Sequence, residues 1–396
     1  MPFGKKVKNF FALEKNIIVI TIANLFWATV ILYKDFLPKF YESLGASVFF
    51  VGLLFSLGNL FYVIASFWGG HLSDKHGRKY IFARTTLIGN FLLLGYIFAP
   101  NWIFLIPFIM FGNILGGLGD ASAQTLISES APKKRRATAL ASIYAMASLF
   151  GAVLIPIGAL FIQNYGMLGG VRISVLISLI FSLIGTFILF FYGKETFKKS
   201  KQNKIDFSIY ELKKFFKKLP FNVKGIFLFI SLLYFSSALL TPLWIFYSLD
   251  VIKISSFEFG ILSSIQFIVV AFFQFTGAKL SDKYGRKKIF LISVLACCVF
   301  EILFILSTNF MQLVFVYLIG GIGAMGFSTI FAYVADNIDQ KRRSKAIGIT
   351  NGLMTLVSIP APFIGSLFYT VAPQYPFIFS SLLLIITFIV GMKFLK

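Results

Sequence analysis

Two acidic side chains lie deep inside long apolar stretches of this sequence, and they are the residues best suited to chemistry. Asp120 falls within the stretch 102–127, and Glu301 falls near the middle of the stretch 289–307. An ionisable group at membrane depth costs roughly a few kcal/mol, so it usually has a function or a dedicated partner. Asp120 is a candidate for binding and releasing a proton; the alternatives are a hydrogen bond to a neighbouring helix or a ligand contact without titration. For Glu301 we expect an interhelical role.

Uncharged polar and aromatic side chains also occur at this depth and could contact a ligand. They are Asn24, Trp27, Gln124, Tyr144, Tyr234, Gln266, Gln274 and Asn351. For any one of them, hydrogen bonding between helices is at least as common a use. The sequence has no cluster of charges that would bind a sugar phosphate, which favours a neutral, amphipathic or weakly charged small-molecule ligand.

Other chemistries lack the residues that they need. The pattern Gly321-x-Gly323-x-x-Gly326 matches a dinucleotide fingerprint but lies inside an apolar stretch with no preceding strand, so it predicts close helix packing. No Walker sequence is present, and His71 and His76 flank one loop without the constellation of ligands that a metal site needs. We therefore expect no enzyme activity, no cofactor, no metal and no use of ATP.

The elements that must position these residues are membrane-spanning helices. The 396 residues are 58% hydrophobic and 13% charged, with a mean hydropathy of +0.86, and that excludes a soluble protein. Apolar runs near 20 residues long recur along the chain, and each can cross a hydrocarbon core as a helix. The twelve predicted spans are 16–34, 47–68, 80–98, 102–127, 138–162, 172–192, 224–248, 257–278, 289–307, 311–334, 345–370 and 376–393.

The net charge of +22 is explained by topology. All but four of the 37 lysines and arginines lie on one side of the predicted spans, and the four exceptions are Lys34, Lys39, Arg172 and Lys253. By the positive-inside rule, both termini are predicted to be cytoplasmic in a multi-pass protein of the cell membrane. A nucleic-acid partner is therefore not expected.

The two halves of the chain repeat each other. An offset of 208 carries Gly69–Lys79 onto Gly277–Lys287, and an offset of 207 carries Glu129 with Arg135-Arg136 onto Asp336 with Arg342-Arg343. The predicted organisation is a first six-helix bundle (1–193), a basic cytoplasmic linker (194–223) and a second six-helix bundle (224–396). Within the linker, 206–219 has the pattern of an amphipathic helix that would bind anionic lipid; a plain basic tether is the alternative.

The repeated loop resembles the signature G-x-L-a-D-r-x-G-R-k of the major facilitator superfamily. It is complete at Gly70–Lys79, and Ala278 replaces the first glycine in the second copy. The resemblance implies an all-α membrane protein of twelve helices in two pseudo-symmetric six-helix bundles around a central cavity. It also implies that spans 1, 4, 7 and 10 line this cavity. Asn24, Trp27, Gln124 and Tyr234 are then the first candidates for substrate contact, and Asp120 for proton coupling.

The same resemblance predicts a gate on the cytoplasmic side. Its residues are Gly70, Asp74, Gly77, Arg78, Lys79, Asp282, Gly285, Arg286 and Lys287, with Glu129 and Asp336 as partners. Gly77 and Gly285 allow a tight turn at positive φ, and the aspartates can pair with the arginines. We expect a latch between the halves that closes the cytoplasmic face. The alternative is solvated ion pairs without a conformational role.

Further motifs favour proton-coupled export of a drug-like or amphipathic compound, by a protein that we expect to be monomeric. Lys194-Glu195-Thr196 resembles the P-E-T sequence of the family, and Gly151 with Pro156-Ile157-Gly158 resembles a Gly/Pro-rich stretch of proton-driven drug antiporters. Ile155 and Ala159 replace two glycines of that stretch, and the arginine usual in span 4 is absent. Import of a sugar or organic acid, by proton symport or uniport, is the alternative.

Overall fold

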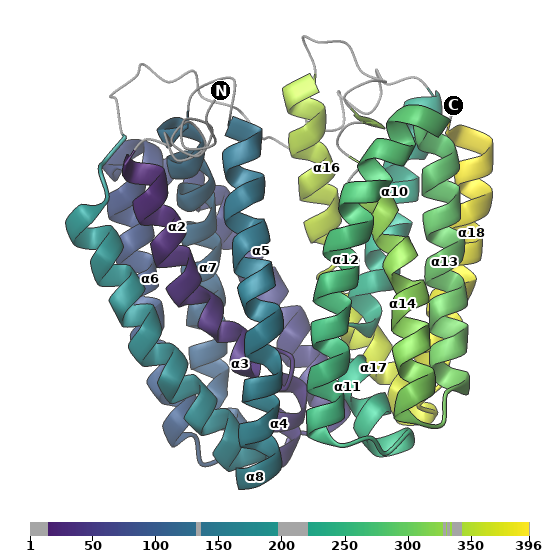
Figure 1. The fold of residues 1–396 in the computed structure, drawn as a ribbon, viewed down its shortest axis with the longest axis horizontal. Coiled ribbons are helices and arrows are strands. Elements are labelled where there is room, and N and C mark those ends of the chain that lie inside the picture. The colour runs from purple at the N-terminus through teal and green to yellow at the C-terminus, as the bar shows by residue number, and fades with distance from the viewer. Residues whose placement is uncertain are drawn as a thin grey trace, which may run out of the picture. The chain divides into compact units, whose positions relative to one another are not determined.

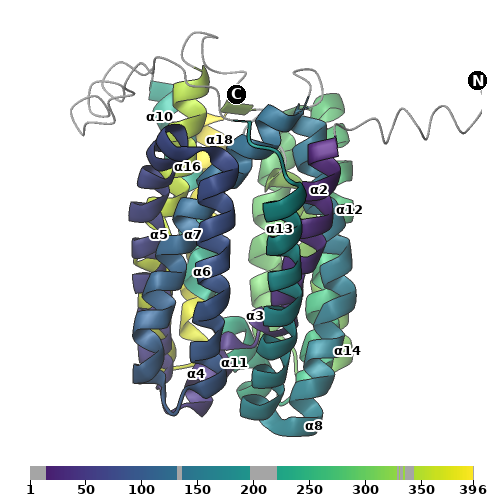
Figure 2. The same ribbon diagram turned by 90° about the vertical axis from the view of Figure 1, so that its left-hand side faces the viewer.

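The structure is a computed structural model that describes residues 15–131, 136–196, 221–327, 330, 333–334 and 343–395. All secondary-structure elements in these residues are helices (Figures 1 and 2). The predicted all-α class is confirmed for the described part of the chain. The predicted linker helix at 206–219 lies outside the described residues.

The helices of the first half run from Lys15 to Tyr192. Their bounds are α2 (Lys15–Trp27), η1 (Ala28–Val30), α3 (Ile31–Lys34), α4 (Leu37–Ser43), α5 (Val48–His76), α6 (Arg78–Phe98), α7 (Trp102–Ser130) and α8 (Arg136–Tyr192). The second half contains α10 (Phe221–Leu240), α11 (Leu243–Phe246), the π-helical turn η3 (Tyr247–Val251), α12 (Ser256–Tyr284), α13 (Arg286–Leu306), α14 (Phe310–Phe327), α16 (Arg343–Val357), α17 (Ala361–Val371) and α18 (Tyr375–Phe394).

The described residues of each predicted span are largely helical, although two spans lie on α8 and others are divided between consecutive helices. Within the described residues, nine helices are long and apolar enough to cross a membrane, and the bent pair Lys224–Leu240 and Leu243–Val251 forms one more. One of the nine, Met146–Tyr192, would be about 70 Å long if straight, so it cannot be a single crossing. Its backbone breaks at Gly166, where φ is 73°, between the predicted spans 138–162 and 172–192. The shorter helix Phe310–Gly326 accounts for most of the predicted span 311–334.

Proline explains the main interruptions of the second half. The pair α10 and α11 is bent by 43° across Thr241 and Pro242, because proline removes a backbone donor and clashes with the preceding turn. A turn at residues 358–360, which ends in Pro360, separates α16 from α17. In contrast, α8 continues through Pro156.

The chain divides into two compact units. Unit 1 comprises residues 1–46 and 57–199, and unit 2 comprises residues 47–56 and 200–396. The first turns of α5 therefore group with unit 2, where the Ser56 hydroxyl accepts a hydrogen bond of 2.9 Å from the backbone N–H of Phe363. That N–H lies in the first turn of α17 and has no partner within its own helix.

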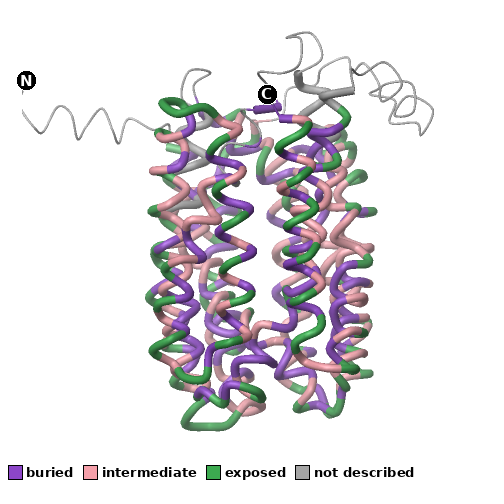
Figure 3. Tube along the Cα trace, turned by 90° about the vertical axis from the view of Figure 1, so that its right-hand side faces the viewer, coloured by how far each residue is buried: buried purple, intermediate pink, exposed green. Residues whose placement is uncertain are grey.

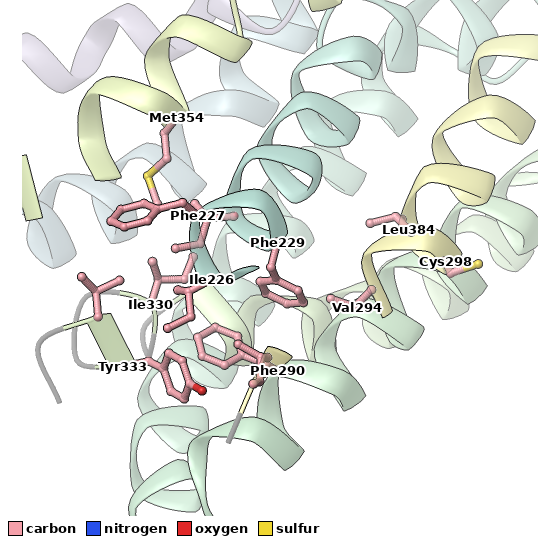
Figure 4. Packing of buried hydrophobic residues seen from close by; sticks show 13 residues of the cluster. Ile226, Phe227, Phe229, Phe290, Val294, Cys298, Ile330, Tyr333, Met354 and Leu384 are labelled. Atoms are coloured by element: carbon pink, nitrogen blue, oxygen red, sulfur yellow. The ribbon is translucent and has the colours of Figure 1, made fainter. Parts of the chain in front are cut away.

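Each unit has its own buried apolar core. In unit 1 the core is formed by α2, α6, α7 and α8 around Ile17, Ile20 and Leu126. In unit 2, residues of α10, α13, α16 and α18 pack together (Figure 4). The Phe290 ring meets Phe229 and Tyr333 edge to face, with ring centroids 5.6 and 5.5 Å apart. This geometry is favourable for aromatic rings because it brings a positive ring edge to a negative ring face.

The outer faces carry large apolar side chains. Exposed residues recur along the length of the helices rather than only at their ends (Figure 3). Trp68, Phe191 and Phe275 are 68%, 70% and 66% exposed, which is unfavourable in water and favourable in contact with lipid tails. The arrangement is that of a membrane protein.

Glycine allows the helices of each unit to touch, and these contacts repeat between the halves. A Cβ placed on Gly69 of α5 would lie 2.8 Å from Leu118 Cα of α7; one placed on Gly277 of α12 would lie 2.5 Å from Met325 Cα of α14. Real Cβ atoms essentially never approach this closely, so both positions require glycine. The residues correspond at offsets of 208 and 207, as in the sequence repeat.

Two further pairs of contacts follow the same offsets. Gly119 faces Thr85, and Gly326 faces Ser293. Gly158 of α8 packs against the backbone carbonyl of Leu32, and Gly365 of α17 packs against that of Leu239. The internal repeat of the sequence is therefore also a repeat of helix contacts.

The space around the first glycine of the signature explains why the second copy can have alanine there. A Cβ on Gly70 would meet no atom within 4 Å, so this position does not need glycine for space. Ala278, its counterpart, is consistent with that freedom.

We predict opposite effects for two neighbouring substitutions. Gly69→Ala should lower stability by about 1–3 kcal/mol, because the backbone of α7 would have to move. Gly70→Ala should leave stability unchanged or raise it by up to about 1 kcal/mol, since alanine favours helix. Thermal unfolding of the purified proteins, followed by near-UV circular dichroism, measures both; equal stability of the two variants would contradict the packing argument.

Candidate functional site

A network of charges surrounds Arg78 at the basic end of unit 1, meaning the end next to the lysine- and arginine-rich loops. The chain turns sharply between α5 and α6 at Gly77, where φ is 106°. Arg78 Nη2 lies 2.7 Å from Asp74 Oδ1, and Arg78 Nε lies 3.3 Å from Glu129 Oε2. Arg78 Nη1 donates to the Ser73 carbonyl at 3.1 Å. One guanidinium thus joins the ends of α5 and α7 to the start of α6.

Glu195 caps the first turn of α6. Its Oε1 accepts a hydrogen bond from the Arg78 backbone N–H at 2.9 Å, and its Oε2 accepts one from that of Tyr80 at 3.2 Å. A carboxylate at a helix N-terminus satisfies free N–H groups and interacts favourably with the helix dipole. A Cβ on Gly77 would lie 2.6 Å from Glu195 Oε2, so Gly77 provides space as well as a positive φ.

The sequence analysis noted Glu195 only as part of a family motif and missed this capping role. The available signal was the glycine at the N-cap of α6, which has no side chain to cap the helix itself.

Further hydrogen bonds hold the segment that contains Glu195. Thr196 Oγ1 donates to Glu129 Oε2 at 2.6 Å. Asn16 at the start of α2 accepts from the Lys194 backbone N–H at 2.8 Å, and its amide donates to the Lys194 carbonyl and the Ser130 hydroxyl. The residues after α8 are therefore tied to α2, α6 and α7.

The signature lysines cap the last helix of each half. Lys79 Nζ donates to the carbonyl of Phe190 at 2.6 Å, and Lys287 Nζ donates to that of Met392 at 3.1 Å. Both carbonyls lie two residues before the end of their helix, α8 and α18 respectively. A cation at this place satisfies a terminal carbonyl and complements the helix dipole.

The second signature loop has the same turn but a more open ion pair. Gly285 has a φ of 91°, and Arg286 Nη2 lies 3.9 Å from Asp282 Oδ1. The Asp282 side chain is 76% exposed, compared with 31% for Asp74. Asp336, the predicted partner in this half, lies outside the described residues. In the described residues the dense network belongs to unit 1.

Asp120 lies near the middle of unit 1. It is exposed on α7, and its Oδ2 accepts a hydrogen bond from the Tyr62 hydroxyl at 2.8 Å. Tyr62 is the central residue of α5, about 21 Å along the helix from either end. This hydrogen bond therefore links the interior of α7 to the midpoint of α5.

The four predicted substrate contacts lie in different surroundings. Gln124 is exposed on the face of α7 that carries Asp120, one helical turn further along. Asn24 Nδ2 donates to the Ile143 carbonyl at 3.5 Å. Trp27 Nε1 donates to Thr186 Oγ1 at 3.2 Å. Tyr234 is partly buried against the core of unit 2. Only Asp120 and Gln124 of the predicted residues share an exposed face; a role in substrate contact stays a prediction for all four.

Glu301 joins three helices of unit 2. Its side chain is buried in α13, and its two oxygens accept hydrogen bonds from Ser380 Oγ at 2.9 Å and Ser381 Oγ at 3.1 Å, both on α18. The Ser380 hydroxyl also lies 2.6 Å from that of Ser236 on α10. These contacts account for a buried carboxyl by hydrogen bonding between helices.

Comparison with known proteins places this architecture in a family. The sequence matches the Major Facilitator Superfamily over residues 17–251 and 226–396. The chain belongs to the major facilitator superfamily. It is 28% identical over 295 residues to the multidrug resistance protein MdtG of Salmonella paratyphi A, an alignment that covers 71% of this chain and 69% of that protein. The MdtG of Salmonella arizonae is 27% identical over 292 residues.

Solved structures agree on the fold. The nucleoside transporter NupG superposes with a TM-score of 0.76 at 15% identity, covering 97% of this chain and 99% of NupG. A bacterial homologue of the human lysosomal transporter Spinster, in an inward-facing and occupied conformation, gives 0.74 at 15% identity, with 97% and 96% covered. This major facilitator protein is thus a multi-pass membrane transporter for small molecules and not an enzyme.

Substitution at Glu195 should loosen the start of α6 in this transporter. In Glu195→Gln only one of the two acceptor oxygens remains, so one amide loses its partner, at a cost of about 1 kcal/mol. We expect the amides of residues 78–81 to exchange with deuterium about fivefold faster, as mass spectrometry of the peptide 77–83 would detect.

Glu129→Gln is the matched control. It removes the charge that faces Arg78 but keeps an oxygen that can accept the Thr196 hydrogen bond, so both capping bonds of Glu195 stay in place. Exchange at residues 78–81 should stay at the wild-type rate in this variant. An equal acceleration in both variants would mean that the ion pair, not the cap, holds the first turn of α6.

Proposed function

We propose that this protein is a secondary active transporter that exports a drug-like or amphipathic compound across the cell membrane in exchange for protons. It works by alternating access, with both termini in the cytoplasm. The observation that carries the proposal is the exposed carboxyl of Asp120 within the apolar helix α7, hydrogen-bonded by Tyr62 at the midpoint of α5.

The surroundings of Asp120 suit reversible protonation. The Tyr62 hydroxyl can donate a hydrogen bond to the carboxylate and can also accept one from the neutral acid, because a hydroxyl is both donor and acceptor. The carboxyl is exposed, so its solvation would change when the protein opens to one side of the membrane or the other. Glu301 is buried, and its oxygens are already bonded to two serines, which supports Asp120 as the coupling acid.

Export is supported by the names of the relatives and by the packing of the fifth predicted span, 138–162. The matched MdtG proteins are named multidrug resistance proteins. In the Gly/Pro-rich stretch of α8, Gly151 lies against the Ile31 side chain and Gly158 against the Leu32 backbone, so this stretch holds α8 close to the kinked first span. Ile155 and Ala159, which replace two glycines of the antiporter pattern, are fully buried.

The signature loops are proposed as the gate on the cytoplasmic side. In unit 1, Arg78, Glu129 and Glu195 bind the basic ends of α5, α6 and α7 to the segment after α8. These helix ends would therefore move together during the transport cycle. The predicted latch between the halves would form or break around this rigid group.

Asp120→Asn should abolish proton movement while solute exchange continues. The asparagine keeps an acceptor for Tyr62 but cannot titrate, so substrate movement is uncoupled from protons. The test uses purified protein in liposomes that contain a pH-sensitive dye. Cationic amphiphiles, sugars and small organic acids are added with and without an imposed proton gradient. A substrate-dependent pH change in the wild type, lost in the variant, supports coupling, and the active compound class separates export from nutrient import.

Glu301→Gln is the matched control, because it changes a second membrane-embedded acid and can still accept hydrogen bonds from the serines. Coupling should persist in this variant. If coupling survives in Asp120→Asn and disappears in Glu301→Gln, the proton-binding acid is Glu301 of unit 2 and not Asp120. Labelled solute that crosses without any pH change in the wild type would identify a facilitator.

A further inference from the structure

One face of α6 is exposed along the whole length of the helix. The helix packs against α7 and α8 along one side of unit 1 (Figure 1). Its exposed side chains recur at steps of three or four residues, which places them on a single helical face. They are Tyr80, Arg84, Ile88, Phe91, Leu94 and Phe98. All but Arg84 are aromatic or aliphatic, so this face is suited to contact with lipid tails.

The internal repeat shows that Arg84 is unusual on this face. The offset of 208 carries Arg84 onto Ile292 of α13, which is exposed as well. It also carries Phe91 onto Val299, another exposed residue. The two halves therefore present equivalent exposed faces, and unit 2 has an isoleucine where unit 1 has an arginine. A cation on a surface that contacts lipid is unfavourable unless its charge reaches the headgroups and meets an anion there.

The guanidinium of Arg84 is held toward the basic end of unit 1. Arg84 is the seventh residue of α6, about 9 Å along the helix axis from the first. Its Cζ lies 3.8 Å from the ring centre of Tyr80, which is one turn nearer to the start of the helix. Stacking on an aromatic ring orients the guanidinium and leaves the N–H groups at its edge free to donate. A long side chain oriented in this way brings its charge toward the headgroup layer.

These N–H groups have no acceptor among the described residues: Arg84 makes neither a hydrogen bond nor an ion pair with any of them. The neighbouring cations of α6 differ in this respect. Arg78 is paired with Asp74 and Glu129, and Lys79 donates to the carbonyl of Phe190. Within the described part of the chain, Arg84 is therefore the cation of α6 that a ligand from the membrane can bind.

We propose that Arg84 and the exposed face of α6 bind an anionic phospholipid. The phosphodiester accepts two N–H groups of the guanidinium, whose planar geometry matches that of a phosphate. An acyl chain lies along Ile88, Phe91 and Leu94, which continue the same face toward the other end of the helix.

The charge of the site favours a particular headgroup. In phosphatidylglycerol the phosphodiester is the only charge, and a single cation compensates it. A choline or ethanolamine headgroup brings a cation of its own, and α6 contains no acidic residue that could bind it. The site should therefore prefer phosphatidylglycerol to phosphatidylcholine.

Native mass spectrometry tests this preference on the purified full-length protein in detergent. The protein is titrated with phosphatidylglycerol or phosphatidylcholine of identical acyl chains. The wild type should bind one phosphatidylglycerol about tenfold more tightly than phosphatidylcholine, because charge-assisted, bidentate hydrogen bonds are strong. Arg84→Ile, which installs the residue that unit 2 has at this place, should bind both lipids equally. Arg84→Lys should keep a preference of about threefold, since it retains the charge but not the paired donors.

Lys288→Gln is the matched control. It removes an exposed cation at the basic end of α13, at the position that corresponds to Tyr80, and it should keep the wild-type preference. Thermal unfolding gives a second measurement, because a ligand of the folded state raises its stability. Phosphatidylglycerol should raise the unfolding temperature of the wild type more than phosphatidylcholine does, and this difference should vanish in Arg84→Ile.

Three results would overturn the proposal. Equal binding of the two lipids by the wild type would mean that the headgroup charge is not recognised. A preference that persists in Arg84→Ile would place the anion elsewhere. An equal loss of preference in Lys288→Gln and Arg84→Ile would indicate general attraction to basic helix ends. A monodisperse elution profile of each variant excludes misfolding as the cause. Lipid binding at Arg84 does not depend on the transported compound or on protons, so its failure would leave the proposed transport function standing.

Discussion

The architecture of each unit depends on close contact between helix backbones. Lipid tails are as apolar as leucine, so burial of apolar side chains gives little driving force for helix association inside a membrane. Dispersion contacts and short interhelical hydrogen bonds must replace it, and both require close approach. Gly69, Gly158 and their counterparts Gly277 and Gly365 remove the side chain where neighbouring helices meet. The polar side chains of the site can face each other across α5 and α7 only because these helices touch at such points.

Once the helices are packed, the signature loops fix their ends. In unit 1, Arg78 and Glu195 serve opposite needs of the α5–α6 turn: the guanidinium binds carboxylates, and the carboxylate of Glu195 binds the free amides of α6. Lys79 and Lys287 satisfy carbonyls at the opposite type of helix end. A motif that looks like a surface charge cluster in the sequence thus completes the hydrogen bonding of helix termini, whose end groups have no partner within their own helix.

The sequence predicted the features that follow from composition and repetition. Hydropathy predicted the spans, and the offsets of 207 and 208 predicted a repeat that the glycine contacts reproduce. It could not predict which polar side chains of a span point to a neighbour, because that depends on the rotation of each helix. Trp27 and Asn24 bond within unit 1 for this reason.

The two embedded acids show how the surroundings decide the use of a charge in a membrane. Glu301 has two hydroxyl donors and is enclosed by α10, α13 and α18, so all its interactions are made inside unit 2. Asp120 accepts one hydrogen bond, from the Tyr62 hydroxyl, and its side chain is exposed on α7. A carboxylate with an incomplete set of partners gains most from a further ligand, whether a proton or a cation. This difference in surroundings is why we propose the exposed acid of unit 1, and not the better buried acid of unit 2, for the transport cycle.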